Sequence, residues 1–256
     1  MSVAIIGAHG YVGRSMLKIF PEAYAYDINV GSKNEVNKRE LAIICVPTPC
    51  VDKGECDTSI VEEIISWLNT KHILIKSTVA PGTTDYLSRR YQKEIHFSPE
   101  YVGESKYQIT PWRYMSKDDP LTHDFIIIGG PSPEGIAQFF LEKLGPEKVY
   151  FFCTAKEAEI IKYMENCWGA TKIIFCYEFF QLCERLGASY MKVREGWLLD
   201  NRIERMHTAV FDRKGFSGRC LPKDVAAILF LADFIGVDMK VLKAVLEKNI
   251  QLSENA

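Results

Sequence analysis

Short apolar runs alternate with longer segments of mixed polarity through the first half of the chain. The runs cover residues 3–6, 24–26, 41–46, 73–75, 95–97, 125–128 and 149–152. Each has the length of a strand, and most of the segments between them have the length of a helix, which predicts a mostly parallel sheet. The stretch between Asp27 and Leu41 is short for a crossover that holds a full helix, so we expect the helix there to be reduced or absent.

The second half of the chain shows no further strand pattern. Thr154 and Glu157 have the spacing of a capping box, which predicts the start of a long helix that ends near Leu186, before Gly187. Two more helices are expected at about 221–235 and 238–252. The pattern predicts an α/β fold, with the sheet in residues 1–153 and an all-helical domain in residues 154–256.

The first apolar run leads into a turn that contains Gly7, Gly10 and Gly13. Asp27 ends the second short strand, twenty residues after Gly7. In a dinucleotide-binding fold an acidic residue at about this spacing accepts hydrogen bonds from the adenosine ribose. The turn differs from the usual Gly-x-Gly-x-x-Gly by one extra residue, His9. A strand, a glycine turn and an acidic residue in this order predict a Rossmann-like domain that binds NAD rather than NADP.

Composition narrows the function classes. Hydrophobic residues make up 47% and charged residues 25% of the 256 residues, and the net charge of −2 gives no electrostatic reason to expect nucleic acid or a membrane surface as partner. There is no basic-then-apolar leader and no apolar run near about 18 residues, so we expect a cytoplasmic protein with reduced thiols. The 8 cysteines contain no Cys-x-x-Cys pair, and we expect no metal site.

Residues 215–224, with the sequence GFSGRCLPKD, place Cys220 directly before a predicted helix. Pro222 suits the first turn of that helix, so free backbone amides and the positive end of the helix dipole would favour the thiolate. Gly215 lets the backbone approach a substrate closely, and Asp224 follows Cys220 by one helical turn. The pattern favours a reactive cysteine, and a buried structural cysteine is the alternative.

Further segments occur in the order found in one enzyme family. They are GYVG at 10–13, VPTP at 46–49, KSTVAPGTT at 76–84, SPEYVGE at 98–104, AEIIKYMENCWGATK at 158–172 and GFSGRCLPKD at 215–224. With these matches the chain resembles the UDP-glucose/GDP-mannose 6-dehydrogenases. The resemblance implies a cytosolic, NAD-dependent enzyme that oxidises the C6 alcohol of a nucleotide-linked hexose to a carboxylate, with two hydride transfers per turnover.

The resemblance also implies roles for individual side chains. Cys220 matches the family nucleophile, which forms a thiohemiacetal and then a thioester. Lys162 and Asn166 lie four residues apart on one predicted helical face, where they would stabilise the oxygen that becomes negative during the reaction. The family positions that organise water and proton transfer are matched by Asp224, Glu100 and Thr78. On a helix surface or a loop, such side chains are more often simply solvated.

The binding sites are implied in the same way. The positions that match family contacts to NAD are Gly10, Val12, Gly13, Asp27, Pro47, Thr48, Thr78 and Glu104. The positions that would contact the nucleotide-sugar substrate are Glu100, Lys162, Asn166, Arg202 and Gly215. Arg202 matches an arginine that reaches a nucleotide across a dimer, with an ordinary surface arginine as the alternative. We expect a homodimer formed through the C-terminal helices.

The sequence departs from the family pattern in several places. GFGGSC is GFSGRC here, so Ser217 replaces a glycine and Arg219 adds a cation beside Cys220. Family members continue past the last predicted helix into a second Rossmann-like domain that holds most of the nucleotide, and these 256 residues are expected to lack it. Because remote binding energy supports the rate at the reacting carbon, we expect weakened turnover.

Two other functions remain compatible with the pattern. A two-electron dehydrogenase of the hydroxyacid type has a similar build and needs no cysteine nucleophile. A non-catalytic NAD-binding or dimerising protein would bind its ligand without turnover. The sequence does not identify the sugar or its nucleotide.

Overall fold

The computed structural model describes residues 1–51, 54–103, 119–210 and 215–254, and the chain divides into two compact units. The first unit comprises Met1–Pro49 and Cys56–Lys162. The second comprises Cys50–Glu55 and Tyr163–Ala256. The domain division expected between residues 153 and 154 stays a prediction.

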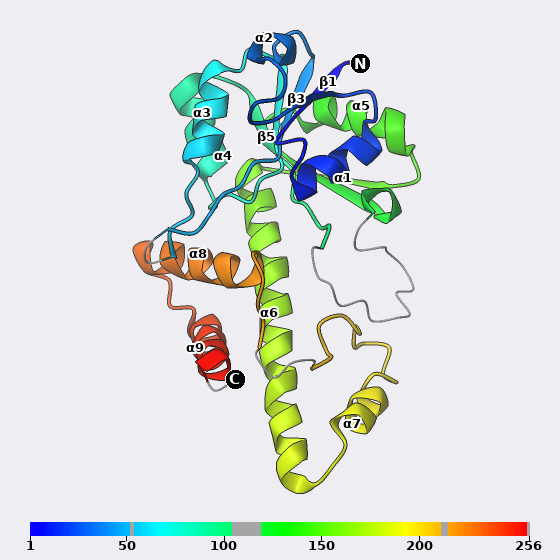
Figure 1. Ribbon diagram of the computed structural model, residues 1–256, viewed down its shortest axis with the longest axis vertical. Coiled ribbons are helices and arrows are strands. Elements are labelled where there is room, and N and C mark those ends of the chain that lie inside the picture. Colours follow the sequence, from blue (N-terminus) through cyan, green and yellow to red (C-terminus); the bar gives the residue numbers. More distant parts are fainter. Residues whose placement is uncertain (52–53, 104–118, 211–214, 255–256) are drawn as a thin grey trace. The chain divides into compact units, whose positions relative to one another are not determined.

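The first unit contains one sheet (Figure 1). Its strands are β1 (Val3–Ile6), β2 (Tyr24–Tyr26), β3 (Leu41–Ile44), β4 (His72–Ile75), β5 (Ile95–Phe97), β6 (Phe125–Gly129) and β7 (Val149–Cys153). They lie in the order β2-β1-β3-β4-β5-β6-β7. Neighbouring strands are parallel except β5 and β6, which are antiparallel and meet at Phe97 and Gly129. The expected mostly parallel sheet is confirmed.

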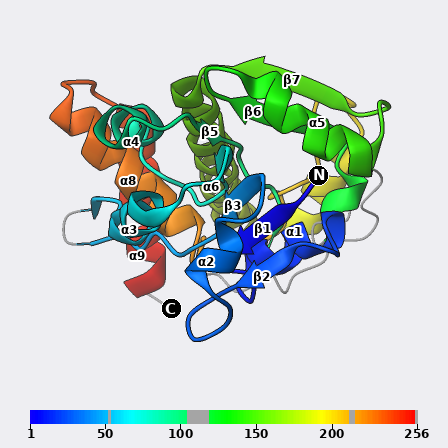
Figure 2. The ribbon, with the colours of Figure 1, turned by 90° about the horizontal axis from the view of Figure 1, so that it is seen from above.

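Helices cover both faces of this sheet, and Figures 1 and 2 show α3 and α4 on the opposite side from α1 and α5. Their bounds are α1 (Tyr11–Ile19), α2 (Lys33–Val36), α3 (Ser59–Trp67), α4 (Thr83–Tyr91) and α5 (Pro133–Leu144), with a 3-10 helix, η2 (Pro120–Thr122). Alternate residues of β1 point to the two faces: Ala4 and Ile6 pack with residues of α3, and Val3 and Ile5 with residues of α1 and α5. The four-residue α2 confirms that this helix is reduced.

Helix α6 (Ala155–Leu186) begins in the first unit and continues into the second. The predicted capping box is present, because Glu157 N donates to Thr154 Oγ1 at 3.2 Å and Thr154 N donates to Glu157 Oε2 at 2.8 Å. Gly187 follows the helix with φ +69°, a left-handed conformation that glycine adopts without strain. Both predicted ends of this helix are therefore confirmed.

The second unit also contains α7 (Tyr190–Trp197), α8 (Leu221–Phe234) and α9 (Lys240–Glu254). Helices α8 and α9 confirm the two expected C-terminal helices, whereas α7 was not predicted. The apolar cluster of this unit joins α6, α8 and α9 around Tyr177, Phe216, Val225 and Val245. No helix in the described part of the chain is both long and apolar enough to cross a membrane.

Candidate active site

The turn between β1 and α1 requires glycine at two positions. Gly7 has φ +79°, and a Cβ there would lie 2.5 Å from the carbonyl oxygen of Cys45. A Cβ on Gly13 would lie 2.1 Å from the carbonyl oxygen of Gly7. Gly10 is the N-cap of α1 and has no side chain to cap it, so the first amides of the helix stay available to an anion. This turn fits the pyrophosphate of a dinucleotide, and half-buried Val12 lies in the first turn of the helix.

Asp27 follows β2 and lies against the same turn. Its Oδ2 accepts a hydrogen bond from His9 N at 2.8 Å, and its Oδ1 accepts one from Ile28 N at 2.8 Å. An ionised carboxylate offers about four acceptor sites, so two remain for ribose hydroxyls. The extra residue of the turn, His9, therefore orients Asp27 through its backbone amide, and its imidazole is exposed.

Thr48 and Thr78 come together beyond the carboxyl ends of β3 and β4. Thr48 is buried and its Oγ1 donates to the carbonyl oxygen of Thr78 at 2.6 Å. Cys56 Sγ donates to the same oxygen at 3.7 Å, and Pro47 is exposed. The carboxyl ends of neighbouring parallel strands are where doubly wound sheets bind their ligands, so both threonines lie at the expected edge.

Glu100 is buried beyond the end of β5 and pairs with Lys76. Its Oε2 lies 3.3 Å from Lys76 Nζ, and its Oε1 accepts hydrogen bonds from Tyr101 N at 2.8 Å and Val102 N at 3.0 Å. Burial by itself raises the pKa of Glu100, but the Lys76 ammonium and the two amides outweigh burial and hold that pKa below its usual value. The carboxylate is therefore ionised at neutral pH.

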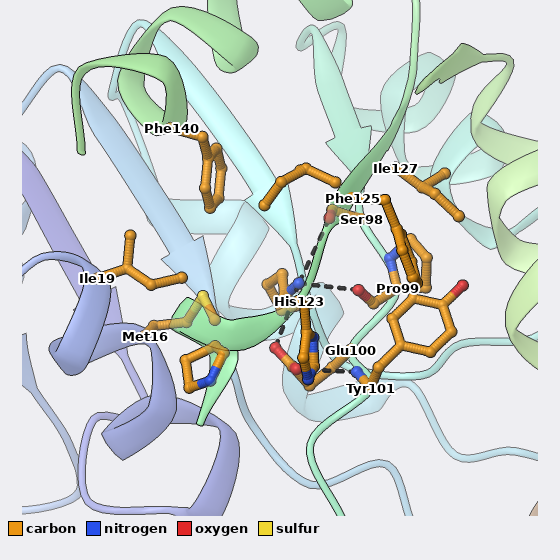
Figure 3. A pocket seen from close by; sticks show the side chains of 13 residues that line it. Met16, Ile19, Ser98, Pro99, Glu100, Tyr101, His123, Phe125, Ile127 and Phe140 are labelled. Atoms are coloured by element: carbon orange, nitrogen blue, oxygen red, sulfur yellow. Dashed lines mark hydrogen bonds and ion pairs between the residues drawn. The ribbon is translucent and has the colours of Figure 1, made fainter. Parts of the chain in front are cut away.

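A small cavity of about 20 Å³ adjoins this pair (Figure 3). Its polar lining comes from Lys76, Ser98, Glu100 and His123, and aromatic and aliphatic side chains such as Phe140 form the rest. A cavity of this size has room for one water molecule, because one water needs roughly 10–15 Å³. A hexose does not fit into it.

Lys162, another predicted site residue, is buried on α6. Its Nζ lies 5.0 Å from the centre of the Tyr101 ring, in a cation–π contact, and Tyr101 directly follows Glu100 in the sequence. Most lysines on a helix surface are solvated, and the buried Lys162 side chain differs from them. Glu104, predicted to contact NAD, lies outside the described residues.

In the second unit, Cys220 is the N-cap residue of α8 and is exposed. It is therefore not the buried structural cysteine considered as the alternative. Asp224 N donates to Cys220 O at 2.9 Å, which places the two residues one turn apart. The Asp224 side chain is only 1% exposed and accepts hydrogen bonds from Asn166 Nδ2 and from Lys223 Nζ. The structure thus brings together the predicted site residues Asn166 and Asp224.

The loop that carries Cys220 is held at its start by α9. Asn249 is buried, and its Oδ1 accepts from Phe216 N at 2.7 Å while its Nδ2 donates to Phe216 O at 3.1 Å. Gly215 has φ +75°, and a Cβ there would lie 2.2 Å from Asn249 Oδ1. Arg202, by contrast, is exposed and pairs with Asp200 two residues away.

Comparisons with known proteins agree with this arrangement. Residues 17–139 match the model of the UDP-glucose/GDP-mannose dehydrogenase family NAD-binding domain, and residues 156–251 match the model of its central domain. The chain belongs to the UDP-glucose/GDP-mannose dehydrogenase family. The first of these matches confirms NAD as the cofactor predicted from the glycine turn and Asp27.

Relatives of this dehydrogenase family member include enzymes from several bacteria. The chain is 33% identical to UDP-glucose 6-dehydrogenase of Rickettsia conorii over 235 residues, which cover 87% of this chain and 51% of the relative. It is 31% identical to UDP-glucose 6-dehydrogenase TuaD of Bacillus subtilis, over 84% of this chain and 47% of the relative. The chain therefore spans about half the length of the curated relatives it matches.

A solved structure extends the likeness of this family member to three dimensions. The UDP-glucose dehydrogenase of Pyrobaculum islandicum superposes with a TM-score of 0.83 at 26% identity, covering 98% of this chain and 68% of that one. The predicted Rossmann-like sheet followed by a helical region is confirmed by this match.

Three buried polar residues of this family member were missed from the sequence. Lys76 could have been found, because it directly follows an apolar strand and opens the segment KSTVAPGTT. Glu159 accepts hydrogen bonds from Gly82 N and from both the amide and the hydroxyl of Thr84. Glu159 and Asn249 carry no local signal, since glutamate and asparagine are ordinary residues on a helix and only the fold buries them.

Proposed function

We propose that this protein catalyses the NAD-dependent oxidation of the C6 alcohol of a nucleotide sugar, such as UDP-glucose, to the uronic acid through a covalent intermediate on Cys220. The observation that supports it most is the exposed thiol at the N-cap of α8 in a chain whose two matched domains belong to nucleotide-sugar dehydrogenases. NAD, when bound, accepts a hydride from C6 in each of the two oxidation steps.

The covalent stage follows from the chemistry of the thiol. Loss of a hydride and of the hydroxyl proton from the C6 alcohol gives an aldehyde. The Cys220 thiolate adds to the carbonyl carbon C6, and uptake of a proton by the oxygen gives a thiohemiacetal. Loss of the hydroxyl proton and of a second hydride from C6 gives a thioester. Water then replaces sulfur at C6, which releases the carboxylate, the thiol and a proton. Free helix amides at the N-cap favour the thiolate that this sequence needs.

The remaining predicted residues have roles in charge and proton handling. Lys162 and Asn166 stabilise the oxygen on C6 as it becomes negative. Glu100, which is ionised at neutral pH, accepts a proton during hydrolysis, and Asp224 and Thr78 orient the water. Gly215 and Arg202 contact the nucleotide sugar.

The test is a paired measurement of reduced nicotinamide and of sugar product with UDP-glucose and NAD. We expect two reduced cofactors for each uronate. Cys220→Ser should lower the rate of acid formation by roughly 10³-fold or more, because the thioester can no longer form. Cys50→Ser is the matched control, since Cys50 is also exposed and has no proposed role.

The outcomes separate the alternatives. Acid formation that survives Cys220→Ser would point to two-electron chemistry of the hydroxyacid type. Absence of any reduced nicotinamide with several nucleotide sugars would favour a non-catalytic NAD-binding protein. Weak turnover of these 256 residues and a cytoplasmic location stay predictions.

We further propose that two copies associate through α6, whereas the C-terminal helices were expected from the sequence to form the dimer. One face of this helix carries exposed apolar side chains spaced three, four or seven residues apart: Met164, Trp168, Phe175, Phe179, Leu182 and Leu186. An exposed apolar stripe of this length indicates a protein partner, and an identical stripe on a second copy matches it.

Light scattering after size-exclusion chromatography tests this association. The wild type should have twice the mass of one chain, and Phe179→Glu should have the mass of one. Val149→Glu is the control, because Val149 is an exposed apolar residue of β7, outside α6. A wild type that runs as a single chain would refute the proposal.

A further inference from the structure

Lys76 is a buried lysine at the carboxyl end of β4. Only 6% of its surface is exposed, and its Nζ donates to Pro99 O at 2.9 Å and to Ser98 Oγ at 3.4 Å. The third neighbour of Nζ is Glu100 Oε2, at 3.3 Å (Figure 3). A buried lysine is costly to charge unless its partners compensate for the lost water, and this set of oxygens does so.

The Glu100 carboxylate is fixed from its other side. The backbone amides of Tyr101 and Val102 both bind Oε1, which leaves the carboxylate a single orientation. Glu100 Oε2 is buried and lies 3.3 Å from Lys76 Nζ, and the ammonium lowers the pKa of Glu100 through its charge and through a hydrogen bond. A carboxylate oxygen has two lone pairs, so this ion pair leaves one of them for a proton while the charge is stabilised.

The other titratable groups that face Glu100 come from separate elements. His123 follows η2, and burial, the main cause, lowers its pKa, so the imidazole is neutral at pH 7. Cys45 follows β3, and burial raises the pKa of its thiol far above neutrality. Lys162 of α6 lies over the ring of the adjacent Tyr101. Of His123, Cys45 and Lys76, only Lys76 brings a positive charge to Glu100.

We propose that Lys76 is a positioning residue of the oxidation reaction, whose ammonium holds the Glu100 carboxylate in place and ionised so that Oε2 can accept a proton. The inference rests on the proposed function, in which Glu100 is the base. Lys76 itself acts through Glu100 and donates no proton to the sugar.

Replacement of Lys76 should change the pH dependence of the reaction. Without the ammonium, burial dominates and Glu100 is protonated at higher pH. In Lys76→Met the low-pH limb of the pH–rate profile for uronic acid formation should move at least about one pH unit towards alkaline pH. Below that limb the rate should fall about tenfold per pH unit. Lys76→Arg keeps the charge and should keep the wild-type limb. Ser98→Ala is the uncharged control and should also keep it.

The deciding experiment is an infrared titration of the carboxyl groups without substrate, with Glu100→Gln used to assign the Glu100 band. The usual pKa of a glutamate is 4.5, and in the wild type the Glu100 band should remain that of a carboxylate down to a pH below this value. In Lys76→Met it should become that of a carboxylic acid at higher pH. A wild-type band that is already protonated near neutral pH, or one that Lys76→Met does not move, overturns the proposal.

This readout separates the inference from the function on which it rests. A band that shifts in Lys76→Met while Glu100→Gln still forms acid at the wild-type rate would refute Glu100 as the base, and with it the positioning role. If Lys76→Met does not fold, the wild-type band alone decides the charge state, and Lys76→Arg tests whether charge suffices.

Discussion

Two buried glutamates of the first unit, Glu100 beyond β5 and Glu159 on α6, respond to burial in opposite ways. Glu100 is 8% exposed and faces the Lys76 ammonium, and its pKa lies below the usual value. Glu159 is fully buried and accepts hydrogen bonds from the amides of Gly82 and Thr84 and from the Thr84 hydroxyl, all of them neutral donors. Burial raises the pKa of Glu159 to about 7.

The difference shows that hydrogen bonds alone do not offset the loss of water around a charge. Three neutral donors satisfy the oxygens of Glu159 at the start of α4, yet its charged form stays disfavoured. One ammonium with two amides reverses the balance at Glu100. Glu100 is thus suited to remain a base at neutral pH, and Glu159 to a structural role.

The largest expected effect comes from breaking the pair that makes Glu100 different. Lys76→Met should lower the free energy of unfolding at pH 7 by about 3–5 kcal/mol, because it leaves a buried carboxylate without its cation. The measurement is urea denaturation followed by circular dichroism. In the double variant Lys76→Met/Glu100→Gln most of the loss should return, since both charges are gone. Equal destabilisation of the single and double variants would contradict the ionic account.

A second prediction concerns the pH dependence due to Glu159. Its native pKa is raised, so between pH 4.5 and about 7 the native state binds more protons than the unfolded state, and stability falls as pH rises through this window. The unfolding free energy of the wild type, relative to that of Glu159→Gln, should fall by about 3 kcal/mol across it, at 1.36 kcal/mol per pKa unit. Above about pH 7 the difference should be constant.

The comparison with Glu159→Gln is necessary because buried histidines act in the opposite direction. Burial lowers the pKa of His96 and of His123, and stability due to each rises as pH rises towards the usual value of 6.5. Both proteins share this contribution, so it cancels in the difference. A difference that does not vary with pH would show that Glu159 has no raised pKa.

A neutral buried side chain in the second unit provides the third test. Asn249→Leu should lower the free energy of unfolding by about 1–3 kcal/mol, because Phe216 N and O lose their partners. Unlike the effects at the glutamates, this loss should not depend on pH. Ser253→Ala, one turn later on α9, is the control and should have a small effect. Alkylation of Cys220 by iodoacetamide should also change in Asn249→Leu, since the loop before Cys220 is released.

The smallest effect is expected at an exposed ion pair whose lysine lies three residues before Glu159 in the sequence. Lys156 Nζ lies 3.8 Å from Asp85 Oδ2, and both side chains are well exposed. Lys156→Ala should therefore cost less than about 1 kcal/mol, and added salt should remove the difference. A loss as large as that in Lys76→Met would refute burial as the cause of the contrast.

The sequence predicted most of the fold because its signals are local. The apolar runs fix the strands, the Thr154–Glu157 capping box fixes the start of α6, and Gly187 fixes its end. Helix α7 was missed, since its eight residues carry mixed charges and a weak apolar pattern. The antiparallel pairing of β5 with β6 was not predicted either, because strand direction depends on the path of the chain between them.

The candidate site was predictable only in part. Asp27 and Cys220 were found because a strand end or a helix start precedes a reactive residue type. The partners of these residues could not be derived, since Lys76 meets Glu100 across two strands and Asn166 meets Asp224 across two helices. Such pairs form only after the chain has folded, and no spacing in the sequence records them.

The short segment Cys50–Glu55 lies between β3 and α3 in sequence and yet belongs to the second unit. Gly54, with φ +96°, approaches α8 so closely that a Cβ would lie 2.9 Å from the carbonyl oxygen of Ala226. A gene split after residue 153 would therefore give fragments that each lack part of a packed contact. Such fragments should restore structure by complementation when mixed, and a circular permutant that keeps this segment beside α8 should be easier to express than either fragment.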